Sequence, residues 1–403
     1  MDHASPFAQV PAAPPDPILG LTEAFLKDPT HGKVNLGVGV YLNEHGKVPI
    51  LQCVAEAQRR WLEQEDTKTY LPIDGIKAYN RAAQELVLGQ DSAAIREGRA
   101  VTVQTLGGTG ALRVGAELLR RFLGDRGVWI STPSWENHRA LFEAAGHSVY
   151  QYPYYDPSTH ALDFDGLATA LDRMPEGSVV VLHACCHNPS GVDPTPEQWR
   201  QIHRMLAQKH LLPFFDFAYQ GLGDGLDADA FAVREYVALG LPCLIASSFS
   251  KSFSLYRERV GALTVITGSQ EESARVLSQL KRVIRASVSN PPSFGGQVVS
   301  LVLNDSELSQ LWRDELEAMR QRILRMRRLF VRTLNEKGVG RDFSFVERQK
   351  GMFSFLGLPV EAVHRMRKEF GIYAVDSSRV CVAAMNEGNI GRICDAIRAV
   401  AEG

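Results

Sequence analysis

Residues 178–191 read Ser-Val-Val-Val-Leu-His-Ala-Cys-Cys-His-Asn-Pro-Ser-Gly, an apolar β-branched run that ends in a polar turn. Similar short runs cover 100–104, 127–131, 212–216, 243–247 and 260–267, and helical patterns separate them at about 110–122, 137–145, 196–209 and 229–239. Strands that alternate with helices of this length indicate parallel β-α-β units around a covered sheet. We therefore expect an α/β fold with a mostly parallel central sheet in a large domain.

The ends of the chain differ from this central region. Residues 1–17 are rich in proline and predict an extended N-terminal arm. Helical spacing covers about 18–27, 52–65, 76–88 and 306–336, and the segment 34–41 predicts a strand. Short strands near 352–356 and 379–383, with helices at 359–369 and 389–401, predict a smaller α+β domain. We expect this domain to comprise 18–47 and 319–403, and the large domain 48–318.

Composition excludes several classes of protein. The 403 residues include 44 Lys plus Arg and 46 Asp plus Glu, so a net charge of −2 offers no general basis for binding nucleic acid or an anionic membrane. Six cysteines without a Cys-x-x-Cys pair favour reduced thiols in a cytoplasmic protein. The N-terminus lacks the pattern of a secretory signal, and no apolar run is long enough to span a bilayer.

Ligands of open parallel sheets bind beyond the carboxyl ends of the strands, so the residues that follow each strand matter most. Leu106-Gly107-Gly108-Thr109-Gly110 opens a helix, where free backbone N–H groups and the helix dipole favour an anion. By itself this segment is more typical of a plain glycine-rich turn. Asp216 ends a very apolar run, as either a helix cap or a functional charge with a cationic partner.

Taken together, the residues after the strands match the needs of pyridoxal phosphate. A lysine can form an imine, an acid can pair with the pyridinium nitrogen, and a tyrosine and an asparagine can bond the ring oxygen. The glycine-rich helix start, a serine and an arginine can hold the phosphate. The candidates for these tasks are Lys251, Asp216, Tyr219, Asn188, Ser248 and Arg259. We expect no metal site, because His183 and His187 lie in a strand and turn rather than on one helix face.

With these motifs in place, the chain resembles the aspartate and aromatic amino acid aminotransferases of fold type I, class I. The strongest pieces are Cys185-Cys186-His187-Asn188-Pro189, Asp216-Phe217-Ala218-Tyr219-Gln220-Gly221 and Ser247-Ser248-Phe249-Ser250-Lys251, followed by Arg259-Val260-Gly261. The resemblance extends from about residue 16 to Arg379. It implies the fold of the type I pyridoxal-phosphate transferases.

The resemblance also implies roles at the cofactor. Lys251 would hold it covalently and later carry a proton to and from the substrate α-carbon. Asp216 would keep the ring nitrogen protonated, Tyr219 and Asn188 would bond the ring oxygen, and Trp135 would stack on the ring. The phosphate would be held by Gly108, Thr109, Ser248 and Arg259, with Tyr70 of the partner subunit.

For the substrate, the resemblance implies that Arg379 binds the α-carboxylate, with Trp135, Asn188 and the backbone of Gly39 close by. Arg285, from a loop-like segment of the other subunit, would meet a second carboxylate. A homodimer with shared active sites, clasped by the N-terminal arms, follows from the same resemblance. The expected reaction moves the amino group of an aromatic amino acid or aspartate to 2-oxoglutarate and gives a 2-oxo acid and glutamate.

Two positions give conflicting indications of the amino donor. Leu42 replaces the lysine usual in aspartate-type relatives, and an apolar residue near the side-chain end of the pocket would ease entry of an aromatic ring. Asn290 instead retains the aspartate-type residue. A strict aspartate aminotransferase therefore stays an alternative. A lyase or decarboxylase on the same fold is disfavoured by the pair Arg379 and Arg285, and a non-catalytic binding module by the intact set of cofactor residues.

Overall fold

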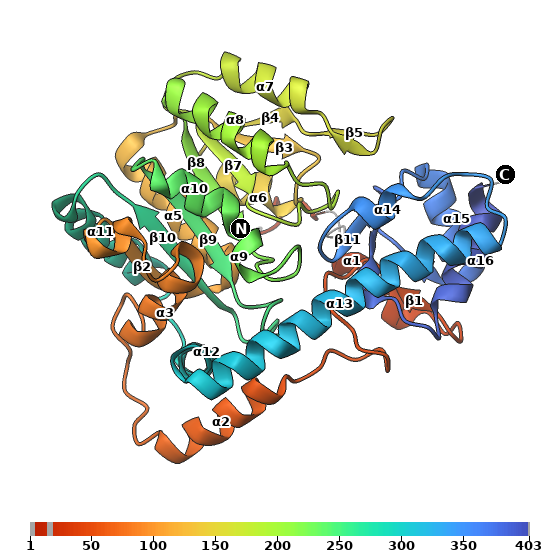
Figure 1. Ribbon diagram of the computed structural model, residues 1–403, viewed down its shortest axis with the longest axis horizontal. Helices are drawn as coiled ribbons and strands as arrows, with labels where there is room; N and C mark the ends of the chain where they lie inside the picture. Colours follow the sequence, from red (N-terminus) through yellow and green to blue (C-terminus); the bar gives the residue numbers. More distant parts are fainter. Residues whose placement is uncertain (1–4, 14–18, 402–403) are drawn as a thin grey trace.

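The computed structural model describes residues 5–13 and 19–401. Residues 1–4 and 14–17 of the predicted arm, and Ile18 of the first predicted helix, lie outside the described residues. A seven-stranded sheet forms the centre of the chain (Figure 1). Its order is β2 (Ala100–Leu106), β10 (Val260–Ile266), β9 (Cys243–Ser248), β8 (Leu212–Phe217), β7 (Val179–His183), β3 (Val128–Thr132) and β4 (Val149–Pro153).

All six strands that were predicted for the central region form, and the prediction of a mostly parallel sheet is confirmed. One strand departs from the β-α-β rule: β10 is antiparallel to both β2 and β9. Its run Val-Gly-Ala-Leu-Thr-Val-Ile is buried throughout, and a buried apolar run carries no information about strand direction. The seventh strand, β4, was not predicted, because Val-Tyr-Gln-Tyr-Pro is an edge sequence with exposed polar and aromatic side chains.

Helices cover both faces of this sheet (Figure 1). Helix α5 packs on β2, β9 and β10. It needs Gly115 where it crosses Phe214, because a Cβ there would lie 2.5 Å from the ring. The helices of this part are α2 (Gln52–Gln64), α3 (Lys77–Leu88), α4 (Ala93–Arg96), α5 (Gly107–Leu123), α6 (Asn137–Ala144), α7 (Phe164–Arg173), α8 (Pro196–Gln208), α9 (Leu226–Asp229), α10 (Phe231–Ala238), α11 (Gln270–Ser287) and α12 (Phe294–Asn304), and β5 (Tyr155–Asp156) pairs with β6 (Ala161–Leu162).

A 31-residue helix, α13 (Ser306–Glu336), runs from this part to a second group of short elements (Figure 1). They are α1 (Leu19–Lys27), β1 (Val34–Asn35), α14 (Phe345–Arg348), β11 (Phe353–Phe355), α15 (Val360–Phe370), β12 (Ile372–Tyr373), β13 (Arg379–Cys381), the 3-10 helix η1 (Val382–Ala384) and α16 (Ile390–Ala401). The strand predicted at 34–41 is shorter than expected, because only its first two residues pair, in parallel with β12. The pairing of β1 with β12 joins the two segments that were predicted to form one domain, 18–47 and 319–403. The boundaries of this domain stay a prediction.

Candidate active site

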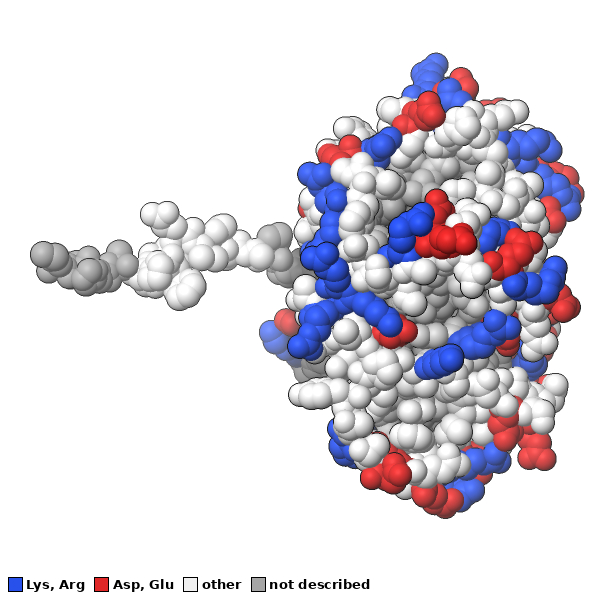
Figure 2. All heavy atoms as spheres, turned by 90° about the vertical axis from the view of Figure 1, so that its left-hand side faces the viewer, with Lys and Arg blue, Asp and Glu red and all other residues white. Residues whose placement is uncertain are grey.

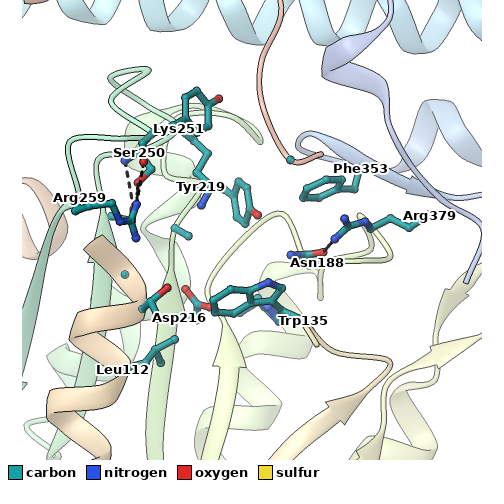
Figure 3. A pocket seen from close by; sticks show the side chains of 17 residues that line it. Leu112, Trp135, Asn188, Asp216, Tyr219, Ser250, Lys251, Arg259, Phe353 and Arg379 are labelled. Atoms are coloured by element: carbon teal, nitrogen blue, oxygen red, sulfur yellow. Dashed lines mark hydrogen bonds between the residues drawn. The ribbon is translucent and has the colours of Figure 1, made fainter. Parts of the chain in front are cut away.

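A cavity of about 220 Å³ lies at the carboxyl ends of β8 and β9 and at the first turn of α5. Figure 3 shows that side chains from the sheet and from the smaller group of elements point into it together. Eleven of the thirteen predicted site residues line this cavity: Gly39, Gly108, Thr109, Trp135, Asn188, Asp216, Tyr219, Ser248, Lys251, Arg259 and Arg379. The structure therefore brings together residues that are as much as 340 positions apart in sequence, from Gly39 to Arg379.

One corner of the cavity has the features of an anion site. The 17-residue helix α5 begins at Gly107, and its positive end faces the Arg259 guanidinium and Ser248. Gly107 has φ +68°, and a Cβ on it would lie only 2.6 Å from Nη2 of Arg259. Arg259 is itself held by donation from Nη1 to the carbonyl of Tyr256 at 2.9 Å. Backbone N–H groups, a hydroxyl and a guanidinium around a space that a side chain would fill suit a phosphate group.

Lys251 lies beside this corner, in the turn after β9. Its amine is 5.1 Å from the centroid of the Tyr219 ring. Removal from water lowers the pKa of Lys251, Asp216 opposes that shift, and the positive charge of Arg259 adds to it. A lysine with a lowered pKa has more of its amine in the neutral, nucleophilic form at neutral pH.

Asp216 is a buried carboxylate near the end of β8, and His138 from α6 contacts it. Nε2 of His138 lies 2.9 Å from Oδ2 of Asp216, and Nδ1 lies 2.9 Å from Oγ of Ser134. Burial alone would raise the pKa of Asp216, but the hydrogen bond with His138 and nearby positive charge hold it below the ordinary value. Asp216 therefore stays ionised and can hold a cationic group in the cavity.

His138 was missed in the sequence analysis, although it follows Trp135 by three positions in Ser-Trp-Glu-Asn-His. That spacing places both rings on one side of the chain at the start of α6, where their centroids are 5.3 Å apart. His183 lies next to His138, and burial lowers the pKa of His183 to about 3, so its ring is neutral. A metal ion could find three ligand atoms in His138, His183 and Asp216. The hydrogen bond between His138 and Asp216, however, already engages two of these residues.

The far wall of the cavity carries a fixed guanidinium. Arg379 is buried, with Nη1 donating to Oδ1 of Asn188 at 3.1 Å and Nη2 donating to the carbonyl of Gly37 at 2.7 Å. Its Nε is buried and has no hydrogen-bond partner within the described residues. Phe353 of β11 is a second residue that sequence reasoning missed, and the centroid of its ring lies 4.4 Å from Cζ of the guanidinium (Figure 3). A buried arginine with a spare donor suits a carboxylate.

Two predicted residues lie outside the cavity. Tyr70 is 86% exposed, and Arg285 is an exposed residue in the last turn of α11, where it contacts Ser289. The expectation of a loop at Arg285 is wrong: the apolar positions of α11 repeat at helical spacing through Leu280, Val283 and Ile284.

The two positions that bear on the donor also lie away from the lining of the cavity. Leu42 is partly buried against the main core and donates its backbone N–H to Ala383, while Asn290 follows α11. The expectation that Leu42 lies at the side-chain end of the pocket finds no support within this chain.

Comparison with known proteins shows the family of the chain. The family model for aminotransferase class I and II matches residues 31–397. The aspartate aminotransferase of Pseudomonas aeruginosa is 54% identical over 97% of this chain and 98% of that protein, and the aromatic-amino-acid aminotransferase of Escherichia coli is 47% identical over 98% and 100%. A crystal structure of the aromatic-amino-acid aminotransferase from Burkholderia pseudomallei, covalently bound to pyridoxal phosphate, matches with a TM-score of 0.96 at 54% identity, over 98% of this chain and 100% of that one.

Proposed function

Because the chain belongs to the class I and II aminotransferase family and is an enzyme that depends on pyridoxal phosphate, we propose that it moves the amino group of aspartate and of aromatic amino acids to 2-oxoglutarate. The observation that carries this proposal is the single cavity that joins Lys251, Asp216 and Arg379. It offers an amine, a fixed negative charge and a carboxylate-binding arginine, which are the groups that such a transfer needs.

The cofactor, when bound, supplies an electron sink for the charge that develops at the substrate α-carbon. We propose that Gly108, Thr109, Ser248 and Arg259 hold its phosphate, supported by the cradle at the start of α5. Asp216, kept ionised by His138, would stabilise a positive charge on the ring nitrogen. Trp135 would cover the ring, since its side chain lines the same cavity.

The remaining residues act on the substrate. Arg379 would fix the α-carboxylate, because its guanidinium is already oriented by Asn188 and Gly37. Lys251, whose pKa is lowered, would take a proton at the α-carbon and return it. Tyr219, where burial raises the pKa of the phenol, stays protonated and would donate its hydrogen bond to the ring oxygen beside Asn188.

We further propose a homodimer in which Tyr70 and Arg285 complete the site of the partner. Neither residue reaches the cavity of its own chain. The described arm residues 5–13 stand clear of the body (Figure 2), with Phe7 and Val10 76% and 67% exposed. Residues 6–9 form a turn rather than the expected extended chain, because Ala8 and Val10 donate their backbone N–H groups to the carbonyls of Ser5 and Phe7. Apolar side chains exposed to this degree on a projecting segment favour a covering surface on a second copy.

The described residues contain no helix that is long and apolar enough to cross a membrane. All six cysteines are buried and free. Free thiols fit a reducing compartment, and we propose that the enzyme works in the cytoplasm.

A strict aspartate aminotransferase stays the second candidate, because Asn290 retains the residue of aspartate-type relatives. The test is Arg285→Leu, assayed with aspartate and with phenylalanine in the donor half-reaction alone, which removes the acceptor from the measurement. An unpaired buried carboxylate is costly, so activity on aspartate should fall by roughly 100-fold or more while activity on phenylalanine changes little.

The matched control is Arg282→Leu, another exposed arginine one turn earlier on α11. It should leave both donors unaffected. If the wild-type enzyme has no activity on phenylalanine, the strict aspartate aminotransferase is the candidate that remains. Equal losses for both donors in Arg285→Leu would remove Arg285 from donor selection.

A further inference from the structure

We propose that two carboxylates outside the cavity, the buried Asp229 and the partly buried Asp193, are positioning residues for Tyr219 and Asn188. Each carboxylate holds the backbone of the loop that carries its partner into the active site. The inference rests on the proposed function, in which Tyr219 and Asn188 bond the ring oxygen of the cofactor. It adds a reason why two loops without regular structure can place these side chains reproducibly.

Asp229 accepts three backbone hydrogen bonds from the loop that follows Tyr219. Its Oδ2 accepts from the N–H groups of Gly221 at 2.8 Å and Gly223 at 2.9 Å, and its Oδ1 accepts from Asp224 at 2.7 Å. The carboxylate is buried and ends the short helix α9. It therefore connects α9 to the loop through both of its oxygens.

This loop leads directly to Tyr219. The N–H of Leu222 donates to the carbonyl of Tyr219 at 3.0 Å, which closes a turn between the tyrosine and the residues held by Asp229. Gln220 ties the same turn to its surroundings, with Nε2 donating to the carbonyls of Leu86 and Leu226 at 3.1 and 3.0 Å. Loss of the Asp229 acceptor would free the turn on one side of the tyrosine.

Asp193 acts in the same manner on the other loop. Its Oδ2 accepts from the N–H of Cys186 at 2.7 Å, and its Oδ1 accepts from the N–H of His187 at 2.9 Å. These two residues immediately precede Asn188, whose Oδ1 accepts from Arg379 at 3.1 Å. Asp193 thus sets the direction in which the backbone enters Asn188.

The cost of burial argues that these carboxylates have a task. Within the described residues neither carboxylate has a cationic side chain within 4.0 Å. The nearby Lys350 forms its ion pair with Asp224. Burial is the largest influence on both and raises the pKa of Asp193 and Asp229, the latter to about 6. A carboxylate that is wholly or partly withdrawn from water without an ion pair needs hydrogen bonds to its oxygens, and here those bonds come from the two loops.

A metal site is the other explanation for this cluster, because ligand atoms of Cys185, Cys186 and Asp229 lie within 4.8 Å of one another. Both oxygens of Asp229 are already engaged by backbone N–H groups. The pKa of each thiol is raised, that of Cys186 to about 11, so neither is a thiolate at neutral pH. The contacts therefore favour a positioning task over metal binding.

The experiment compares Asp229→Asn and Asp193→Asn with Asp227→Asn in the cofactor-loaded enzyme. Asp227 is the matched control, since it lies on the same short helix α9 with its side chain 81% exposed. An asparagine places an NH₂ group opposite a backbone N–H, so Asp229→Asn and Asp193→Asn each lose part of the hydrogen bonding to the loop. Hydrogen exchange should then accelerate in peptides that cover 218–226 for Asp229→Asn and 184–192 for Asp193→Asn.

The second readout is the pH midpoint of the visible absorption change of the loaded enzyme. A hydrogen bond from Tyr219 stabilises the ring oxygen as an anion, so a loosened Tyr219 should raise the midpoint by roughly half a unit or more. The value of kcat/KM should fall about 10- to 100-fold, as expected for a small displacement of a catalytic group. Asp227→Asn should change none of these measurements.

The double variant Tyr219→Phe with Asp229→Asn separates positioning from a general structural effect. If Asp229 acts through Tyr219, Asp229→Asn should add almost no further midpoint shift once the phenol is gone. Full additivity would overturn the proposal, as would an unchanged midpoint in both single variants. If Asp229→Asn does not fold, Asp193→Asn combined with Asn188→Ala decides by the same criterion. Wild-type enzyme without a visible band would instead contradict the proposed function itself.

Discussion

Replacement of His138 by phenylalanine tests whether this histidine keeps Asp216 ionised. Nε2 of His138 lies 2.9 Å from Oδ2 of Asp216, and both side chains are buried. A hydrogen bond to a charged group contributes about 1.5–3 kcal/mol. One pKa unit corresponds to about 1.4 kcal/mol, so loss of the bond should raise the pKa of Asp216 by roughly 1–2 units.

The direction of the effect on rate follows from the charge. Asp216 starts below its ordinary pKa, so its ionised form is lost in wild type only in strong acid. In His138→Phe the acid limb of the pH profile of kcat/KM should therefore move to a pH that is higher by about 1–2 units. At alkaline pH, where Asp216 is still ionised, the fall in kcat/KM should stay below about tenfold. The measurement is the donor half-reaction of the loaded enzyme followed across the pH range.

Two further variants act as controls. Ser134→Ala removes the partner of Nδ1 but keeps the bond to Asp216, and should move the limb less. His138→Gln places an amide N–H near the position of Nε2 and should restore part of the wild-type profile. An acid limb that stays in place in His138→Phe, with cofactor content and thermal stability equal to wild type, would refute the reasoning.

Three other outcomes follow from the site. Lys251→Ala should abolish turnover with the fold retained, and borohydride reduction of wild type followed by peptide mapping should place the cofactor on Lys251; a label on another lysine would contradict this. Gly107→Ala should weaken cofactor binding by about tenfold or more, because its Cβ would lie 2.6 Å from Arg259, whereas Gly124→Ala, at similar φ in open space, should not. Mixing inactive Lys251→Ala and Arg285→Asp subunits should restore some dicarboxylate activity in hybrid dimers, and no recovery after verified exchange would argue against shared sites.

Local sequence patterns were sufficient for the main strands and for the residues that follow them. A buried apolar run followed by Asp216 or by Lys251 is a local signal, since a strand and the turn after it are adjacent in the chain. The rule that ligands gather at the carboxyl ends of strands then predicted one cavity for these side chains, and the cavity lining agrees. The long helix α13 was also predicted with its observed limits, because 31 residues of helical spacing leave little ambiguity.

Only the tertiary structure decided which distant groups meet. Phe353 and Arg379 come from the smaller group of elements, and no local pattern places the phenyl ring 4.4 Å from the guanidinium. The contact of His138 with Asp216 joins α6 to β8 across 78 positions, and the antiparallel direction of β10 depends on its neighbours in the sheet. Hydrophobic periodicity specifies which face of an element is buried, but not which other element covers that face. Strand pairings, shifted pKa values and the hydrogen bonds from the loop to Asp229 therefore arise only when the chain has folded.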